Sequence, residues 1–373
     1  MIPEGATELL GLPAERMDEL LGRVVKRCSW PEPRLLRFEK SISGVEAGTV
    51  IFDNGDVIFG YPKIRRAMML ESAIRRHFFG RVVAEEKMNG YNIRVASING
   101  QIISLTRGGF ICPYSTEVAR EQISRELFED HPELVLCGEM VGPDNPYVPK
   151  NIYPTSSVQI YLFDIAQKGN RTMQGVYRTC ELAEEYGITR APVLGEFDSR
   201  EAFLKVLEIV KNLGREGREG VVLKDPRNEV SPIKYTSSES TCSDLQFAFK
   251  YYYDYAQDFF FSRVVREGFQ SVEWRDSDEE FGLRSQRLGE SILAPMVETI
   301  KRSMAEEQIV QHIQIRVKNL HTAWAFEQHL RRMGVRAIFE RPVPCNGKYL
   351  VGITRPVMST NDKTRSVIEG ELW

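Results

Sequence analysis

The sequence predicts a mixed α/β protein of the α+β class, built around antiparallel sheets. Four Asn-Gly pairs, the strongest short signal for a β-hairpin, lie between strand-like runs. Three stretches with apolar residues at helical spacing lie between these runs. Apolar residues make up 42% of the chain, which is enough for packed cores and excludes a disordered chain. No apolar run approaches the roughly 20 residues that a membrane-spanning helix needs.

Strands are expected on both sides of each Asn-Gly pair. Asn54-Gly55 joins strands at 49–53 and 56–59, and Asn346-Gly347 joins strands at 337–345 and 348–353. Asn89-Gly90 and Asn99-Gly100 divide residues 81–107 into the three strands of a β-meander. Alternating apolar residues predict another strand over 157–165.

Helices are expected at 116–128, 176–186 and 198–213. The last has an Asp-x-x-Glu capping pattern at its start and is predicted to end at Gly214. Six scattered cysteines without a CxxC pair, and five histidines without an HExxH motif, predict reduced thiols in a cytoplasmic protein. Neither a secretory signal nor a zinc site is expected.

Charge is unevenly distributed along the chain. The net charge of −3 and the pI of about 6.1 argue, by themselves, against nucleic acid as a partner. By segment, however, the net charge is −3 for 1–62, +1 for 63–237, −6 for 238–310 and +5 for 311–373. We therefore predict four units: a small β-rich head, a large α/β middle, an acidic helical segment and a basic α/β tail. Aromatic residues at 247–255 and 259–261 predict either a local core or an oligomer interface.

Lys87 is the candidate nucleophile. It ends an apolar strand and precedes the Asn89-Gly90 turn, so the backbone can hold it rigidly beside a pocket with room for a phosphate. The apolar run before it could desolvate the side chain and favour the neutral amine that a nucleophile requires. A lysine before a turn is, taken alone, more often a solvated surface residue.

Four later segments also place functional side chains at the ends of strand-like runs. Arg107 precedes two glycines, which suits phosphate binding, and Glu139 follows the apolar run 134–137. An aromatic strand ends in Phe163-Asp164. Finally, Glu219-Gly220 begins an apolar run that ends at Lys224, and Lys234 follows in Ile-Lys-Tyr.

In this order, the segments resemble the motifs of the covalent nucleotidyltransferases: ATP-dependent DNA and RNA ligases and mRNA capping enzymes. Lys-Met-Asn-Gly resembles motif I, Thr-Arg-Gly-Gly motif Ia, Phe-Asp-Ile motif III, Glu-Gly-Val-Val-Leu-Lys motif IV and Ile-Lys-Tyr motif V. The chain is most similar to the archaeal-type ATP-dependent RNA ligases, which form homodimers and can circularise single-stranded RNA. The resemblance implies an ATP-grasp-like nucleotidyltransferase domain at 63–237, a helical dimerisation domain at 238–310 and an α/β domain at 311–373.

The resemblance also implies the chemistry. Lys87 would attack the α-phosphorus of ATP, AMP would pass to an RNA 5′-phosphate, and an RNA 3′-hydroxyl would then displace AMP. Lys234 would contact the α-phosphate, and as a neighbouring cation it would favour the neutral amine of Lys87. Glu219 would place a metal ion, and Glu139 would face the ribose or the metal. The implied cofactors are ATP and Mg²⁺, with Mn²⁺ as an alternative.

Other residues receive binding roles from the same resemblance. Phe163 would stack on adenine, Glu86 would contact the adenine edge and Arg107 would hold a phosphate of ATP or RNA. Strand alternation makes Asn92 a phosphate or RNA contact, whereas Arg94 is expected to form a structural pair.

Two further residues are less certain candidates. Lys224, on the opposite strand face from Glu219, is a weaker candidate for nucleotide binding than Lys234. Asp164 fits a supporting carboxylate or a strand-end salt bridge equally well.

Two departures from the family pattern leave alternatives open. Asn89 replaces the usual motif I aspartate, and no basic motif VI follows motif V. A DNA ligase, a capping-type nucleotidyltransferase and a non-catalytic RNA-binding oligomer are the alternative functions. The expected partners are single-stranded RNA ends and a second copy of the chain, with no membrane. RNA should meet the pocket around Lys87 and the +5 tail, and the −6 segment should face a protein.

Overall fold

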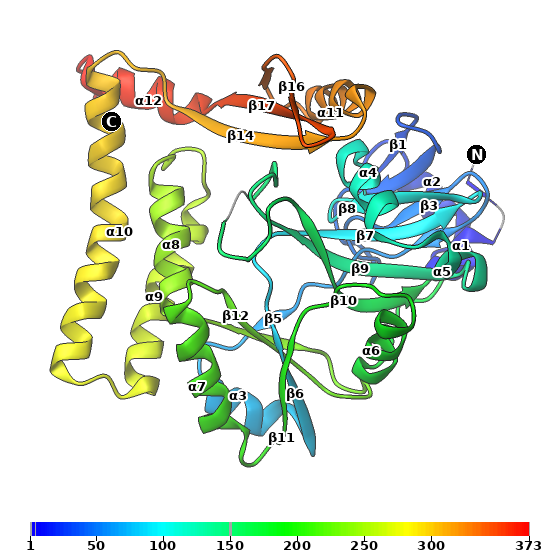
Figure 1. Cartoon of the computed structure of the whole chain (residues 1–373), viewed down its shortest axis with the longest axis horizontal. Helices are drawn as coiled ribbons and strands as arrows, with labels where there is room; N and C mark the ends of the chain where they lie inside the picture. Colours follow the sequence, from blue (N-terminus) through cyan, green and yellow to red (C-terminus); the bar gives the residue numbers. More distant parts are fainter. Residues whose placement is uncertain (1, 4, 149–150, 373) are drawn as a thin grey trace.

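The computed structural model describes residues 2–3, 5–148 and 151–372, and its elements form four parts along the chain (Figure 1). The N-terminal head has two short helices and a four-stranded antiparallel sheet in the order β1-β2-β3-β4. Its elements are α1 (Ala6–Leu10), α2 (Ala14–Leu20), β1 (Val25–Cys28), β2 (Leu35–Phe38), β3 (Val50–Phe52) and β4 (Val57–Ile58). Leu35, Val50 and Phe52 share a core with Ile103 and Leu105 of the next part, so the head packs directly on the central region.

Two sheets form the centre of the molecule. The first has the order β10-β9-β7-β8 and the second the order β11-β6-β12-β13-β5, with β13 and β5 parallel and the other neighbours antiparallel. The first contains β7 (Tyr91–Ile98), β8 (Gln101–Thr106), β9 (Leu134–Val141) and β10 (Gln159–Gln167). The second contains β5 (Arg65–Arg66), β6 (Arg81–Glu86), β11 (Val193–Asp198), β12 (Gly220–Lys224) and β13 (Ile233–Thr236).

Helices pack against each central sheet. Tyr114, Leu136 and Ile160 belong to the core between the first sheet and the helices α4 (Pro113–Gln122), α5 (Arg125–Asp130) and α6 (Val176–Glu185). Ile74 and Val206 belong to the core of the second sheet with α3 (Leu70–His77) and α7 (Ala202–Arg215). Because each sheet buries one apolar face against its helices, polar side chains of both sheets can meet in a cavity between them.

A helical arm and a C-terminal unit complete the chain. The arm contains α8 (Ser238–Phe249), α9 (Gln257–Trp274) and α10 (Asp278–Met304), of which α10 is outermost in Figure 1. The C-terminal unit contains β14 (Val310–Val317), α11 (Leu320–Arg332), β15 (Ile338–Phe339), β16 (Val343–Cys345), β17 (Lys348–Pro356) and α12 (Met358–Ile368). Its residues Ile315 and Phe326 share the core of the first central sheet.

The predicted α+β class with antiparallel sheets is confirmed, but the β-meander is wrong. Residues 81–107 do form three strands, yet β6 lies in the second sheet while β7 and β8 pair in the first. Asn99 and Gly100 have φ values of 51° and 73°, as a two-residue hairpin requires, and Asn346 and Gly347 repeat this geometry. Asn89-Gly90 is instead a crossover between sheets.

Two helix predictions also need correction. The segment 116–128 is divided between α4 and α5, because the Ser124 side chain caps the Glu126 N–H and starts a new helix. The helix predicted at 198–213 begins at Ala202 without a side-chain cap and continues through Gly214 to Arg215. Gly217, with φ of 72°, follows its end.

The six cysteines are free, as predicted. Within residues 2–3, 5–148 and 151–372, no helix has both the length and the apolar character needed to cross a membrane.

Candidate active site

All nine predicted site residues line one cavity of about 670 Å³ between the two central sheets. They come from both sheets and from the connections at their ends: Glu86, Lys87, Asn92, Arg107, Glu139, Phe163, Glu219, Lys224 and Lys234. Residues separated by up to 148 positions therefore converge on one volume of a size suited to a nucleotide.

Lys87 is placed by the pairing of β6 with β12. Its backbone N–H donates to the Gly220 carbonyl at 2.8 Å, and its Nζ lies 2.7 Å from Oε2 of Glu219. Burial lowers the pKa of Lys87, but the Glu219 and Glu139 carboxylates outweigh burial and raise the pKa above its ordinary value. Burial thus acts as predicted, but the expected outcome is reversed, because the two carboxylates outweigh burial and favour the ammonium form.

Asn89 and Gly90 carry the chain from one sheet to the other. The Asn89 N–H donates to the Tyr153 hydroxyl at 2.6 Å, and Asn89 is buried. A Cβ atom on Gly90 would lie 2.0 Å from the Met140 carbonyl oxygen, so only glycine fits this close approach to β9. Lys87 therefore sits where the two sheets separate, which is why it faces a cavity.

Lys234 supplies a cation next to Lys87. It lies on β13 between Val222 of β12 and Arg66 of β5. Among the described residues, its ammonium has no hydrogen-bond or ion-pair partner. Burial, reinforced by the positive charges of Arg66 and Lys87, lowers its pKa to about 8. A partly buried cation without such a partner, beside the candidate nucleophile, is suited to bind a phosphate.

Arg107 is held at the cavity by the head. Its carbonyl would lie 2.1 Å from a Cβ on Gly48, and the Arg37 guanidinium donates to the Gly108 carbonyl at 3.2 Å. The Arg107 side chain is exposed. Because its backbone is held while its side chain is exposed, Arg107 is suited to contact a phosphate that changes position.

Glu139 and Glu219 provide the carboxylates of the cavity. Burial, with a smaller effect from Glu219, raises the pKa of Glu139 to about 7 against the opposing charge of Lys87. Asn92 pairs with Glu139 across the β7–β9 ladder, and within the described ranges its buried Oδ1 has no hydrogen-bond partner. No set of three or more His, Cys, Asp or Glu side chains suited to a metal occurs in the part of the chain that the structure describes. Two carboxylates and an unsatisfied amide oxygen nevertheless fit Mg²⁺, which takes few protein ligands and completes its shell with phosphates and water.

Lys224 has a structural environment despite lining the cavity. It is 6% exposed, and its Nζ lies 2.6 Å from Glu85, 3.1 Å from Asp164 and 2.5 Å from the Phe163 carbonyl oxygen. The Tyr61 hydroxyl donates to Asp164 at 2.5 Å, and its ring meets the Phe163 ring edge-on at 5.2 Å. Asp164 is thus in an ion pair, the second of its two predicted roles.

Two other charged residues are also tied into the fold. The Glu86 carboxylate pairs with Arg218 at 2.8 Å, although Glu86 lines the cavity. Arg94 is fully buried and donates to the carbonyls of Phe59, Gly48 and Thr106. Arg94 is structural, as expected. Its partners, however, are backbone carbonyl oxygens of the head and of β8, not a carboxylate.

The sequence reasoning missed several cavity residues. Glu85 is 3% exposed and lies two positions before Lys87, so strand alternation could have placed it on the same face. The helical arm also contributes Asp244, Phe247, Tyr255, Phe259 and Arg263 to the lining. The aromatic cluster is therefore neither simply a core nor simply an interface, since part of it forms a wall of the cavity.

Comparisons with known proteins agree over the whole chain. Residues 80–236 match the family model for RNA ligase, and residues 247–371 match the model for the Ligase Pab1020 C-terminal region. The uncharacterized protein MJ0414 of Methanocaldococcus jannaschii is 38% identical over 377 residues, covering 98% of this chain and 95% of that protein.

Solved structures extend this agreement to three dimensions. Two structures described as archaeal ATP-dependent RNA ligase, forms 1 and 2, are each 40% identical, with 98% of both chains covered and a TM-score of 0.93. A putative ATP-dependent DNA ligase from Aquifex aeolicus shares the fold, with a TM-score of 0.89 at 24% identity and coverage of 98% of this chain and 99% of that chain.

Proposed function

The chain belongs to the family of archaeal ATP-dependent RNA ligases, and from that premise we propose that it joins RNA 5′-phosphate and 3′-hydroxyl ends through lysyl-AMP and RNA-adenylate intermediates. The convergence of Lys87, Glu219 and Lys234 in one cavity carries the proposal. The other six positions named for the site, and RNA as the substrate, are consistent with the family.

The first step makes the covalent enzyme. Lys87 gives up a proton, its nitrogen bonds to the α-phosphorus of ATP, and the bond from that phosphorus to pyrophosphate breaks. The Lys234 ammonium faces the negative charge that develops on the α-phosphate oxygens. Phe163 offers a ring face to adenine, near the buried Glu85 and Lys224.

The two later steps transfer AMP and then release it. An RNA 5′-phosphate oxygen attacks the AMP phosphorus, and the bond to Lys87 breaks. An RNA 3′-hydroxyl then loses its proton, attacks the activated 5′-phosphorus and expels AMP. Exposed Arg107 can follow a phosphate through these steps, because its loop is fixed while its side chain is free.

We propose that Glu139 and Glu219, with Asn92, hold a divalent cation, Mg²⁺ or Mn²⁺. A bound cation would stabilise charge on the phosphate oxygens and, by neutralising both carboxylates, favour the neutral amine of Lys87. Two observations support this position: the buried Oδ1 of Asn92 has no hydrogen-bond partner among the described residues, and burial raises the pKa of Glu139 despite the opposing charge of Lys87.

The function is tested by incubating the protein with labelled ATP and 5′-phosphorylated single-stranded RNA. Wild type should yield labelled enzyme, adenylated RNA and a joined product, with circles forming when one strand supplies both ends. Lys87→Ala should fold but remain unlabelled, and Lys234→Ala should label far more slowly. Labelled Lys87→Ala protein would exclude Lys87 as the nucleophile, and efficient sealing of nicked DNA instead of RNA would reassign the substrate.

We further propose that the chain forms a homodimer through α10. Leu293, Val297, Ile300 and Met304 recur at helical spacing along this outermost helix and are 39–66% exposed. A second α10 would cover this stripe. Sedimentation should show a dimer at micromolar concentration and a monomer for Val297→Asp; a monomeric wild type would contradict the proposal.

A further inference from the structure

The helical arm presents a flat, charged platform to the cavity. The Arg263 guanidinium carbon lies over the Phe259 ring, 3.4 Å from its centre. Asp244 accepts from Nε and Nη2 of Arg263 at 3.2 and 2.9 Å, and this pairing fixes the guanidinium plane. The Tyr255 ring lies 5.0 Å from Phe259, and all four residues line the cavity. An arginine layered on an aromatic ring is a surface on which a nucleobase stacks.

This platform lies at the phosphate end of the cavity. Arg266, one helical turn after Arg263, donates to Thr236, and Thr236 pairs with Gly220, the residue that follows Glu219. Helix α9 therefore meets the second sheet where Glu219 and Lys87 lie. Phe163 instead contacts Lys224, at the other end of β12. An adenine on Phe163 would leave the platform free for a different group.

A row of cations leads from the nucleophile to the platform. Across the second sheet, Lys87 follows β6, Lys234 lies on β13, Arg66 lies on β5 and Arg263 lies on α9. Arg66 donates to Thr236 at 2.7 Å, and burial lowers its pKa, as does the nearby charge of Arg263. Such a row attracts a polyanion that continues beyond the phosphate of the bound nucleotide.

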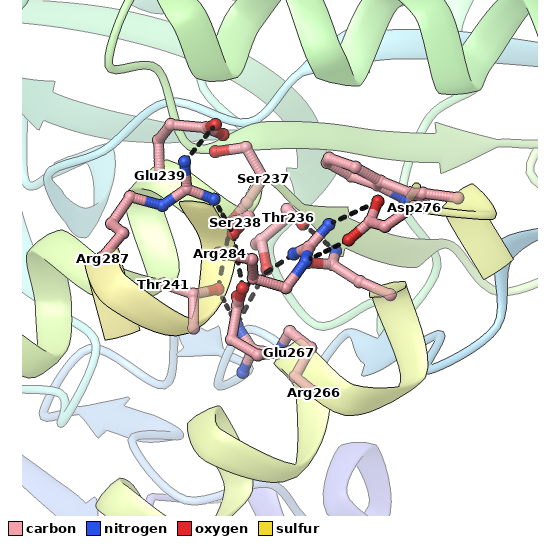
Figure 2. A network of polar contacts seen from close by, with 12 residues as sticks. Thr236, Ser237, Ser238, Glu239, Thr241, Arg266, Glu267, Asp276, Arg284 and Arg287 are labelled. Carbon is pink, nitrogen blue, oxygen red and sulfur yellow. Dashed lines mark hydrogen bonds and ion pairs between the residues drawn. The ribbon is translucent and has the colours of Figure 1, made fainter. Parts of the chain in front are cut away.

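A buried polar network fixes the platform relative to the catalytic strand (Figure 2). Arg284 lies 2.8 Å from Glu267 and 2.6 Å from Asp276, and Ser238 donates to Glu267. The Arg266 guanidinium bonds Thr236 and Thr241, two hydroxyls near the end of the Lys234 strand. Because these groups are buried and bonded to one another, α9 cannot shift without breaking several of these bonds. The platform is therefore a preformed surface.

We propose that the Arg263–Phe259 platform binds the base of the 5′-terminal nucleotide of the RNA strand that receives AMP. This inference rests on the proposed function and adds a subsite to it. With the base on the platform, the terminal phosphate lies on the cation row beside Lys234 and reaches the AMP phosphorus on Lys87. Stacking accepts any base, so the subsite selects a 5′-phosphorylated end without selecting its sequence.

The test isolates AMP transfer from formation of the covalent enzyme. Protein pre-labelled with ATP is mixed with 5′-phosphorylated RNA whose 3′ end is blocked, and single-turnover transfer is measured against RNA concentration. Phe259→Leu keeps apolar volume but removes the ring face; it should label normally and bind RNA about 5- to 150-fold more weakly. Phe259→Tyr should behave like wild type. Arg263→Lys, which keeps the charge but loses the plane, should also weaken RNA binding.

Phe261→Ala is the matched control on the same helix. Phe261 is 71% exposed and does not line the cavity, so its loss should leave both labelling and transfer unchanged. Unchanged transfer by Phe259→Leu would refute the subsite, as would a defect confined to joining of pre-adenylated RNA to an acceptor strand. Failure of wild type to become labelled would refute the proposed function itself, and the subsite with it.

Discussion

Lys224 and Lys234 occupy the same cavity, yet their surroundings predict opposite consequences when each is replaced by methionine. Lys224 is 6% exposed and contacts two buried carboxylates and one carbonyl. Lys224→Met would leave Glu85 and Asp164 as buried charges without their cation. Breaking a buried ion pair in this way costs about 3–5 kcal/mol of unfolding free energy.

The stability lost in Lys224→Met should depend on pH in a defined direction. Burial already raises the pKa of Glu85 to about 7, with Lys224 as the main opposing charge. Without Lys224 the pKa of Glu85 rises further. At pH values above the ordinary carboxyl pKa, the folded state then binds more protons than the unfolded state. Stability of Lys224→Met should therefore fall as the pH rises, and its deficit should be smaller at pH 5 than at pH 8.

The assay is thermal unfolding of wild type, Lys224→Met and Lys234→Met at several pH values. Lys224→Met should lower the midpoint by about 4–6 °C at pH 8. Lys234→Met should change stability by less than about 1 kcal/mol, because Lys234 has no partner among the described residues, yet it should nearly abolish labelling by ATP. A Lys224→Met protein as stable as wild type would refute the structural role. The variant Lys224→Met/Glu85→Gln, which removes one orphaned charge, should recover part of the loss.

Three further predictions concern other parts of the molecule. ATP affinity should fall between pH 7 and 9, because Lys234 loses its proton near pH 8. This pH dependence should disappear in Lys234→Met. If the variant kept the same pH dependence of ATP affinity, Lys234 would be excluded from phosphate binding. Gly90→Ala should destabilise the protein by more than about 1 kcal/mol in urea unfolding, because the added Cβ would lie 2.0 Å from a carbonyl oxygen of β9. The control Gly282→Ala, which has open space on α10, should stabilise the protein by about 0.5–1 kcal/mol. Equal effects of the two variants would contradict the close approach at Gly90. The double variant Arg336→Glu/Arg341→Glu, at two exposed tail positions, should weaken RNA binding and reduce its dependence on salt concentration. A deletion of 311–373 cannot test this, because the tail shares the core of the first central sheet. An unaltered salt dependence would show that the tail does not bind RNA.

Much of the candidate site follows from the residue order. Motif order and spacing identify Lys87, Glu219 and Lys234, and the structure places them in one cavity. Glu85 could also have been found, because alternation puts it on the strand face of Lys87. The contributions of Phe259 and Arg263 could not have been predicted, because no local pattern in 238–310 indicates which central strand the helical arm contacts.

The sequence by itself determined the strand-rich antiparallel class, the candidate nucleophile and the family, since these depend on local patterns and on ordered motifs. Tertiary structure alone decided that Asn89-Gly90 crosses between two sheets, because a hairpin signal does not specify the partner of each strand. It also decided that Lys87 faces carboxylates that favour its ammonium form. Lys224 is ion-paired within the fold, whereas Lys234 has no ion-pair partner in the part of the chain that the structure describes. These properties arise from strand register and long-range burial, which set the distance between charges that are far apart in the chain.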